Sequence, residues 1–115
     1  MTRWIAAAVV VLVLVLAGEA RAASFVEGND LHEWCENEGA GNQSACAAYV
    51  MGIADVITFI KIEGDFKSRA CFSKQMTSVQ LADVVKRWLE QYPEYRHYSA
   101  AGLVGSALAE AFPCE

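Results

Sequence analysis

Four cysteines are the residues of this chain whose type and spacing point most directly to chemistry, and all four follow an apolar N-terminal segment. They are Cys35, Cys46, Cys71 and Cys114. An even number of cysteines in a small exported chain is typical of disulfides that hold the fold. A zinc site is a poor alternative, because the only histidines are His32 and His97 and the sequence has no His-Glu-x-x-His or Cys-x-x-Cys motif. We therefore predict disulfides, no metal site and no cofactor.

A second candidate for chemistry is Asp55, the one acidic residue within an otherwise apolar helical segment, three positions after Gly52. A buried carboxylate needs a partner, and Arg96 or His97 could supply one, so Asp55 and His97 could act as an acid–base pair. No nucleophile with an orienting base accompanies them, which favours a structural role for Asp55. We predict that Gly52, Asp55, Arg96 and His97 are structural residues and that the protein is not an enzyme.

The N-terminal segment has the three parts of a secretory signal peptide. Arg3 supplies positive charge, residues 5–18 are apolar or small, and Ala20-Arg21-Ala22 offers small residues at a cleavage site. A retained membrane anchor fits the length less well, since about fourteen helical residues span about 21 Å and the hydrocarbon core of a bilayer measures about 30 Å. We predict a signal peptide over residues 1–22 and a single soluble domain over residues 23–115, with no membrane contact after cleavage.

The charge of the predicted mature chain narrows its classes of partner. It carries 13 acidic against 7 basic side chains. A nucleic-acid-binding protein normally presents a basic stripe, so nucleic acid is not an expected partner. A basic protein partner is compatible with the negative charge, as is solubility alone. The length allows one domain with a limited core, in which covalent cross-links matter for stability.

Hydrophobic spacing predicts helices through the first half of this domain. A two-turn helix is expected over residues 30–36, followed by a break over residues 39–42. Apolar side chains then recur every three to four positions over residues 44–62, which indicates a long amphipathic helix. Residues 64–76 show no period and are interpreted as a loop pinned by its cysteine.

Two further helices are predicted in the second half. Thr77 followed by Gln80 has the spacing of a capping box, and an apolar face continues from there until Pro93 ends the helix. After a short connector, the last helix runs from about Ser99 until Pro113 stops it. The predicted fold is therefore all-α, a small four-helix bundle held by two disulfides.

Helix directions select one of the three possible cysteine pairings. If consecutive helices run antiparallel, the second and fourth helices end at the same pole, so Cys71 and Cys114 should pair because each follows one of these ends. Cys35 closes the first helix and Cys46 opens the second, so these two should meet at the opposite pole. We predict the disulfides Cys35–Cys46 and Cys71–Cys114.

Several sequence landmarks occur together along the predicted domain. They are Gly28-Asn29-Asp30-Leu31 with Cys35, the run from Cys46 to Asp55, Gln80-Leu81, the run from Pro93 to Ala100, Ala107-Leu108, and the C-terminal Ala111-Phe112-Pro113-Cys114. In combination they resemble the Rap/Tai family of type VI secretion immunity proteins. Members of that family are small helical periplasmic proteins that bind and neutralise toxic effectors, among them cell-wall amidases. The resemblance implies a periplasmic immunity protein whose partner is a secreted effector toxin.

An immunity protein needs no catalysis of its own, because a rigid scaffold can present a loop that fills the active-site cleft of the effector. We predict that one of two loops does this, since loops fixed by disulfides can hold a binding shape. The candidate contact residues are Glu36, Glu38 and Asn42 in the first loop, and Glu63, Asp65, Lys67 and Arg69 in the second.

The alternative function is that of a general periplasmic helical protein, such as an envelope-stress or chaperone-like factor, because one scaffold can serve different tasks. The oligomeric state is open at this point. Apolar residues left exposed on such short helices would be compatible with a homodimer.

Overall fold

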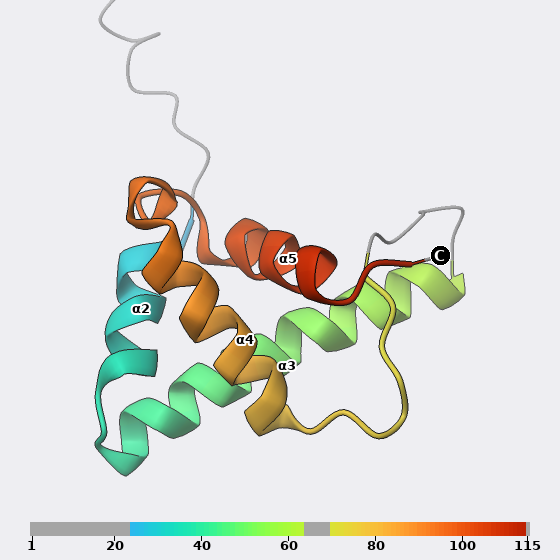
Figure 1. Ribbon diagram of the computed structural model, residues 1–115, viewed down its shortest axis with the longest axis horizontal. Coiled ribbons are helices and arrows are strands. Elements are labelled where there is room, and N and C mark those ends of the chain that lie inside the picture. The colour runs from blue at the N-terminus through green and yellow to red at the C-terminus, as the bar shows by residue number, and fades with distance from the viewer. Residues whose placement is uncertain (1–23, 64–69, 115) are drawn as a thin grey trace, which may run out of the picture.

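The computed structural model describes residues 24–63 and 70–114, and the predicted signal peptide lies outside this part of the chain. The described chain contains four α-helices and one 3₁₀ turn and no strand longer than an isolated bridge (Figure 1). The elements follow in the order α2 (Gly28–Glu36), α3 (Ala40–Glu63), α4 (Ser78–Gln91), η1 (Pro93–Tyr95) and α5 (Ala100–Ala111). The predicted all-α four-helix fold is confirmed.

The first two helices both begin earlier than the sequence pattern indicated. α2 starts at Gly28 because Glu27 and Asp30 form a capping box, in which the Glu27 N–H donates to Asp30 Oδ2 at 2.9 Å. The predicted break over residues 39–42 is shorter than expected, since α3 begins at Ala40. The Gly39 N–H donates to the side-chain oxygen of Asn37 at 2.9 Å, so a tight turn at these residues completes the reversal before Gly41 is reached.

The capping box predicted for the third helix is confirmed. The Gln80 N–H donates to Thr77 Oγ1 at 3.2 Å, and the Thr77 N–H donates to Gln80 Oε1 at 2.9 Å. These two bonds satisfy backbone donors that the first turn of α4 would otherwise leave without partners. The helix ends before Pro93, as predicted, and the connector forms the short turn η1.

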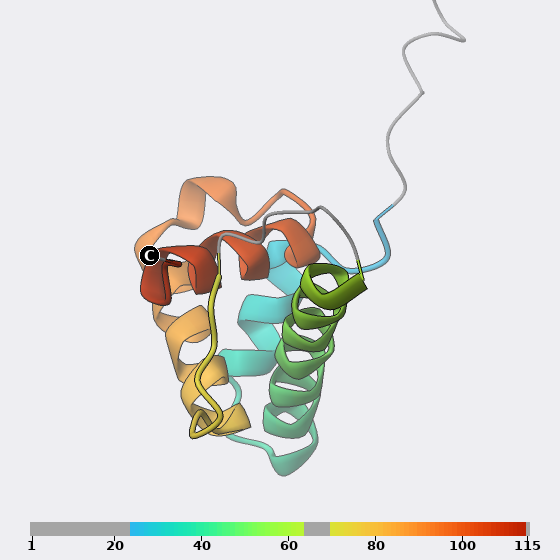
Figure 2. The same ribbon diagram turned by 90° about the vertical axis from the view of Figure 1, so that its right-hand side faces the viewer.

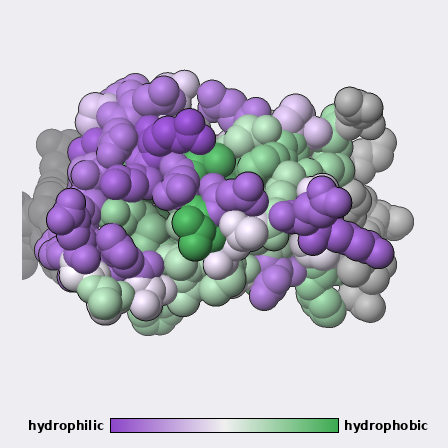
Figure 3. All heavy atoms as spheres, turned by 60° about the horizontal axis from the view of Figure 1, so that its bottom comes forward, coloured by the Kyte–Doolittle hydropathy of each residue, from purple (hydrophilic) through white to green (hydrophobic). Residues whose placement is uncertain are grey.

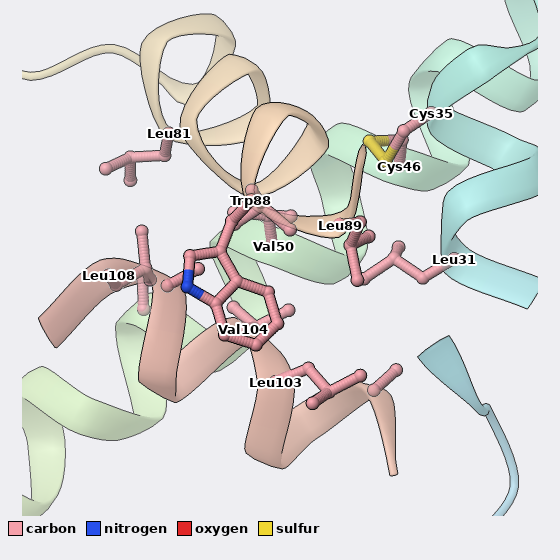
Figure 4. Close-up of a cluster of buried hydrophobic side chains, with 14 of the residues drawn as sticks. Leu31, Cys35, Cys46, Val50, Leu81, Trp88, Leu89, Leu103, Val104 and Leu108 are labelled. Carbon is pink, nitrogen blue, oxygen red and sulfur yellow. A yellow bond between two sulfur atoms is a disulfide. The ribbon is translucent and has the colours of Figure 1, made fainter. Parts of the chain in front are cut away.

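All four helices contribute to one hydrophobic core (Figure 4). Its completely buried larger side chains come from every helix, namely Leu31 of α2, Val50 of α3, Val85 and Leu89 of α4, and Val104 and Leu108 of α5. Trp88 lies among them and is 9% exposed, and Tyr92 packs against the core edge. Burial of these apolar side chains is the main term that favours folding.

The two predicted disulfides are present. Cys35–Cys46 joins the last turn of α2 to the second turn of α3, with 5.1 Å between the Cα atoms. Cys71–Cys114 joins the segment after α3 to the segment after α5, with 5.0 Å between the Cα atoms. Backbone contacts support the second link, because Ala70 bridges to Pro113 and the Cys71 N–H donates to the Phe112 carbonyl at 2.8 Å.

The N-terminal end of α2 is tied to the start of α5 by backbone hydrogen bonds. The Gly28 N–H donates to the Tyr98 carbonyl at 2.9 Å, and the Ala100 N–H donates to the Val26 carbonyl at 2.9 Å. The first and last helices therefore close the bundle directly on each other, although they are far apart in sequence.

The long helix α3 lies at one side of the bundle (Figure 2). It packs on α2, α4 and α5 through one stripe, in which Cys46, Val50 and Ala54 recur every four residues and are buried. The opposite side of α3 is exposed, and this asymmetry shapes the candidate functional surface.

Candidate functional site

The structure separates the residues proposed as an acid–base pair. Asp55 lies on the exposed side of α3, whereas Arg96 and His97 follow η1 in the connector to α5. Arg96 is half-buried, and its Nε–H donates to the Leu89 carbonyl at 2.7 Å. His97 is exposed, and its ring lies 4.2 Å from that of Tyr98. Asp55 does not meet the condition of burial on which the proposed pairing depended.

The end of α2 carries a compact group of ionisable side chains. His32 Nε2 lies 3.6 Å from Glu36 Oε1, one helical turn away. The pKa of the Glu90 carboxyl on α4 is raised, chiefly because it shares a hydrogen bond with Glu36 and further because of desolvation and repulsion between the two carboxylates. The pKa of His32 is lowered, first by desolvation and then by the positive charge of Arg96. The carboxyl groups of Glu36 on α2 and Glu90 on α4 therefore lie close enough to repel each other when both are ionised.

The predicted contact residues of the two loops lie at opposite ends of α3. Glu36 and Glu38 are exposed just before the helix, and Asn42 is half-buried in its first turn. Glu63 is the last residue of α3, and Asp65, Lys67 and Arg69 lie outside the described residues. The helix has 24 residues, so its ends are about 36 Å apart.

The structure reveals an exposed apolar surface that the sequence analysis did not identify. Within residues 40–60 of α3, four large apolar side chains remain accessible, at 39% for Met51, 50% for Val56, 63% for Phe59 and 36% for Ile60. By helical spacing, Met51 and Phe59 lie opposite the buried stripe, Val56 lies beside Phe59, and Ile60 continues the line of the half-buried Ile53 and Ile57. The sequence does contain a signal for this exposed surface, since apolar residues occur on every side of α3. A helix with only one buried face normally has a polar side instead.

Over Ala40–Ile60, α3 is long and apolar enough to span a membrane, and 17% of its most apolar window is buried in the bundle. Length and composition by themselves are weak evidence, since a core helix of a soluble protein meets the same criteria. In this bundle α3 is cross-linked to α2 and contributes Val50 to the core.

Charge is distributed unevenly between the two halves of the sequence. Residues 24–60, which include α2 and most of α3, contain six acidic side chains and no lysine or arginine. Figure 3 shows hydrophilic side chains gathered at the end of the molecule that carries α2, and apolar ones spread over the half into which α3 extends. The exposed apolar side chains of α3 therefore belong to a stretch of sequence, residues 24–60, that has acidic side chains and no lysine or arginine.

Shallow grooves occur between the helices, and their linings give no catalytic arrangement. A groove of about 300 Å³ beside the Cys35–Cys46 disulfide is lined by Val79, Asp83 and Lys86, among others. Within residues 24–63 and 70–114, no group of three or more histidine, cysteine or acidic side chains is placed to hold a metal ion.

Comparison with known proteins decides the family. The model of the Rap1a immunity proteins matches residues 27–114, which include every described helix and all four cysteines. The chain belongs to the Rap1a immunity protein family. The resemblance to the type VI secretion immunity proteins that the sequence landmarks indicated is confirmed. The comparison with curated proteins gave no match.

Membership in the Rap1a family makes this chain an immunity protein, whose task is to bind a toxic effector. A family model does not say which residues make the contact, so the roles predicted for Glu36, Glu38, Asn42 and the loop after Glu63 remain predictions. The same applies to the structural roles of Gly52, Asp55, Arg96 and His97.

Proposed function

We propose that this Rap1a protein is exported to the periplasm, where it binds one type VI secretion effector and blocks its active site without any catalysis of its own. The observation that carries the proposal is the family match over residues 27–114. The predicted signal peptide over residues 1–22 supports export, and the two disulfides are of the kind that persists in an oxidising compartment. The proposed effector class is a peptidoglycan amidase.

A rigid scaffold suits this mechanism, because a binding surface that is already ordered loses little conformational entropy when the complex forms. The Cys35–Cys46 disulfide fixes the turn between α2 and α3, which carries Glu36 and Glu38 at its surface. The Cys71–Cys114 disulfide anchors the segment that follows Arg69. Both predicted blocking loops are therefore adjacent to a covalent cross-link.

The length of α3 sets a limit on how these loops can act. The helix ends that precede the second loop and follow the first are about 36 Å apart, which disfavours insertion of both loops into one active-site cleft. We propose that only one loop enters the cleft. The double variant Glu36→Lys/Glu38→Lys tests the first loop, and Lys67→Glu/Arg69→Glu tests the second. Loss of neutralisation in only one of the two variants identifies the blocking loop.

Periplasmic co-expression tests the function as a whole. The product of the adjacent reading frame, exported to the periplasm, is expected to lyse cells alone and to leave them intact when this chain is co-expressed. A form that lacks residues 1–22 serves as the control and is expected to give no protection, because it remains in the cytoplasm. Equal lysis with and without the full chain would contradict immunity against that effector.

Stoichiometry separates this function from the alternative of an envelope-stress or chaperone-like protein. An immunity protein is expected to form one tight complex of fixed composition, whereas a chaperone-like protein binds many unfolded clients weakly. Sedimentation of the purified chain also measures its oligomeric state, since a homodimer would have twice the mass of the domain spanning residues 23–115.

A further inference from the structure

We infer that the exposed side of α3 is a docking surface for a patch of the effector that combines basic and apolar side chains. This inference rests on the proposed function and adds the surface and the chemistry of the partner. The surface, called here the α3 outer face, consists of Met51, Gly52, Asp55, Val56 and Phe59.

The apolar side chains of the α3 outer face are left without a partner in the bundle. Phe59 is 63% exposed and Val56 is 50% exposed, although α3 buries a separate stripe through Val50 and Ala54. Met51 and Phe59 lie two turns apart on the outer side, with Asp55 between them, so they form one continuous strip. A continuous exposed apolar strip of this kind is typical of an interaction site.

Charge selects the class of partner. Asp55 lies in the middle of the apolar strip, and within the described residues it forms no ion pair. A partner with a lysine or arginine opposite Asp55 would neutralise this carboxylate while its apolar side chains cover Val56 and Phe59.

Two other occupants fit this charge less well. A membrane with anionic lipids would repel Asp55 and the net negative charge of residues 23–115, since binding at a membrane surface usually depends on lysine and arginine. A second copy packed by two-fold symmetry would bring equivalent residues together, so the two Asp55 carboxylates would meet within an apolar interface. A homodimer, if it forms, is therefore expected to use another surface.

Gly52 gives the α3 outer face its shape. A Cβ atom added at Gly52 would have no neighbour within 4 Å, so the glycine is not required by packing inside the bundle. It leaves a notch next to Met51 and Asp55, through which a partner can approach the helix backbone. Glycine is costly within a helix, which is understandable here if the notch is used for binding.

The experiment measures binding of the purified chain, residues 23–115, to the purified product of the adjacent reading frame by calorimetry. Val56→Asp and Asp55→Arg are each expected to weaken binding by about tenfold or more, because the first buries a carboxylate against apolar side chains and the second places a cation opposite the cation of the partner. Gly52→Ala is expected to weaken binding while the melting temperature stays the same or rises. This last variant separates binding from folding.

Matched controls exist on α4. Val79 is 63% exposed and Asp83 is exposed, so Val79→Asp and Asp83→Arg make the same chemical changes outside the α3 outer face. Both controls are expected to bind within about twofold of the wild type. Wild-type affinity in all three α3 variants would overturn the inference and leave the immunity function intact. Absence of binding by the wild-type chain would instead contradict the proposed function, and the inference with it.

Separate measurements test a membrane and a second copy of the chain as occupants of the α3 outer face. Vesicles that contain anionic phospholipid are expected not to bind the wild-type chain, and binding that Val56→Asp abolishes would make a membrane the occupant. A fall in sedimentation mass caused by Val56→Asp but not by Val79→Asp would make a second copy the occupant. Either result would overturn the inference.

Discussion

The indole Nε1–H of Trp88, on α4, donates a hydrogen bond to Glu110 Oε2, on α5, at 2.9 Å. This bond joins two helices across the polar edge of the core, where Trp88 itself is only 9% exposed. Glu110→Ala is expected to lower the free energy of unfolding by about 1 kcal/mol, because it leaves the indole N–H without its acceptor. Urea denaturation at neutral pH measures the change.

Glu110→Gln is the matched control, since its side-chain oxygen can still accept the bond. It is expected to remain within about 0.5 kcal/mol of the wild type. Equal destabilisation by the alanine and glutamine variants would show that the charge of Glu110, and not its hydrogen bond to Trp88, stabilises the contact.

A second prediction concerns Gly28, which is buried where α2 meets the connector to α5. A Cβ atom at this position would collide with the Leu103 side chain and lie 2.7 Å from the Arg96 carbonyl oxygen. Gly28→Ala is expected to cost about 1–3 kcal/mol of stability, because backbone atoms have to move. Gly102→Ala is the control, as its added methyl meets no atom within 4 Å and alanine favours the helix by up to about 1 kcal/mol. Similar melting temperatures for the two variants would contradict this account.

Removal of the disulfides should destabilise the domain unequally. Cys71 and Cys114 are 43 positions apart, whereas Cys35 and Cys46 are 11 apart. Loop entropy predicts losses of about 4 kcal/mol for the longer ring and about 3 kcal/mol for the shorter ring. Denaturant unfolding of the variants Cys71→Ser/Cys114→Ser and Cys35→Ser/Cys46→Ser measures both losses.

Burial of Cys35 and Cys46 adds a second contribution to the stability that is lost when their disulfide is removed. Cys35 and Cys46 are 6% and 4% exposed, so serine at these positions also places hydroxyl groups in the core. The alanine pair Cys35→Ala/Cys46→Ala removes this contribution. If the alanine pair were less stable than Cys71→Ser/Cys114→Ser, ring size would not be the deciding factor.

The pair formed by Glu36 and Glu90 makes stability depend on pH. The folded-state pKa of Glu90 lies above its ordinary value of 4.5, so the protonated form is favoured by folding. The contribution of Glu90 to the free energy of unfolding is fully present below pH 4.5 and is lost as the pH rises through the raised pKa. Glu90→Gln, which cannot ionise, is expected to melt at a higher temperature than the wild type at pH 7, and the difference should close below pH 4.5. Glu94→Gln, which removes an exposed carboxylate outside this pair, is the control.

His32 affects the same melting curves in the opposite direction. Its pKa is lowered from 6.5 in the folded state, so its contribution is present above pH 6.5 and is lost as the pH falls through the lowered pKa. His32→Gln should therefore lose less stability than the wild type between neutral pH and about pH 5. A wild-type loss of stability that persists unchanged in His32→Gln would assign the effect to another group.

Local sequence signals were sufficient for most helix ends. Thr77 and Gln80 cap α4 through their own side chains, and Pro93 and Pro113 stop helices because proline has no N–H and constrains the residue before it. These effects act within a few residues, so they can be read without the fold. The cysteine pairing followed from the same information, because helix ends and antiparallel order place Cys71 near Cys114.

Tertiary packing decided which side of α3 is buried. Apolar residues surround this helix, so spacing alone does not separate the buried Val50 from the exposed Val56 and Phe59. The outcome depends on where α2, α4 and α5 contact α3, which is a relationship between distant segments. The exposure of Asp55 has the same origin.

Long-range contact also produced the features on which the pH predictions depend. Glu36 and Glu90 are 54 positions apart in sequence and share a hydrogen bond only because α2 packs beside α4. Sequence landmarks indicated the family by resemblance, while periodicity predicted the helices and helix direction predicted the cross-links of this Rap1a protein. The exposed apolar side of α3 and the acidic group between α2 and α4 arise from the way the helices are packed, since side-chain environments are set by neighbours that no local pattern encodes.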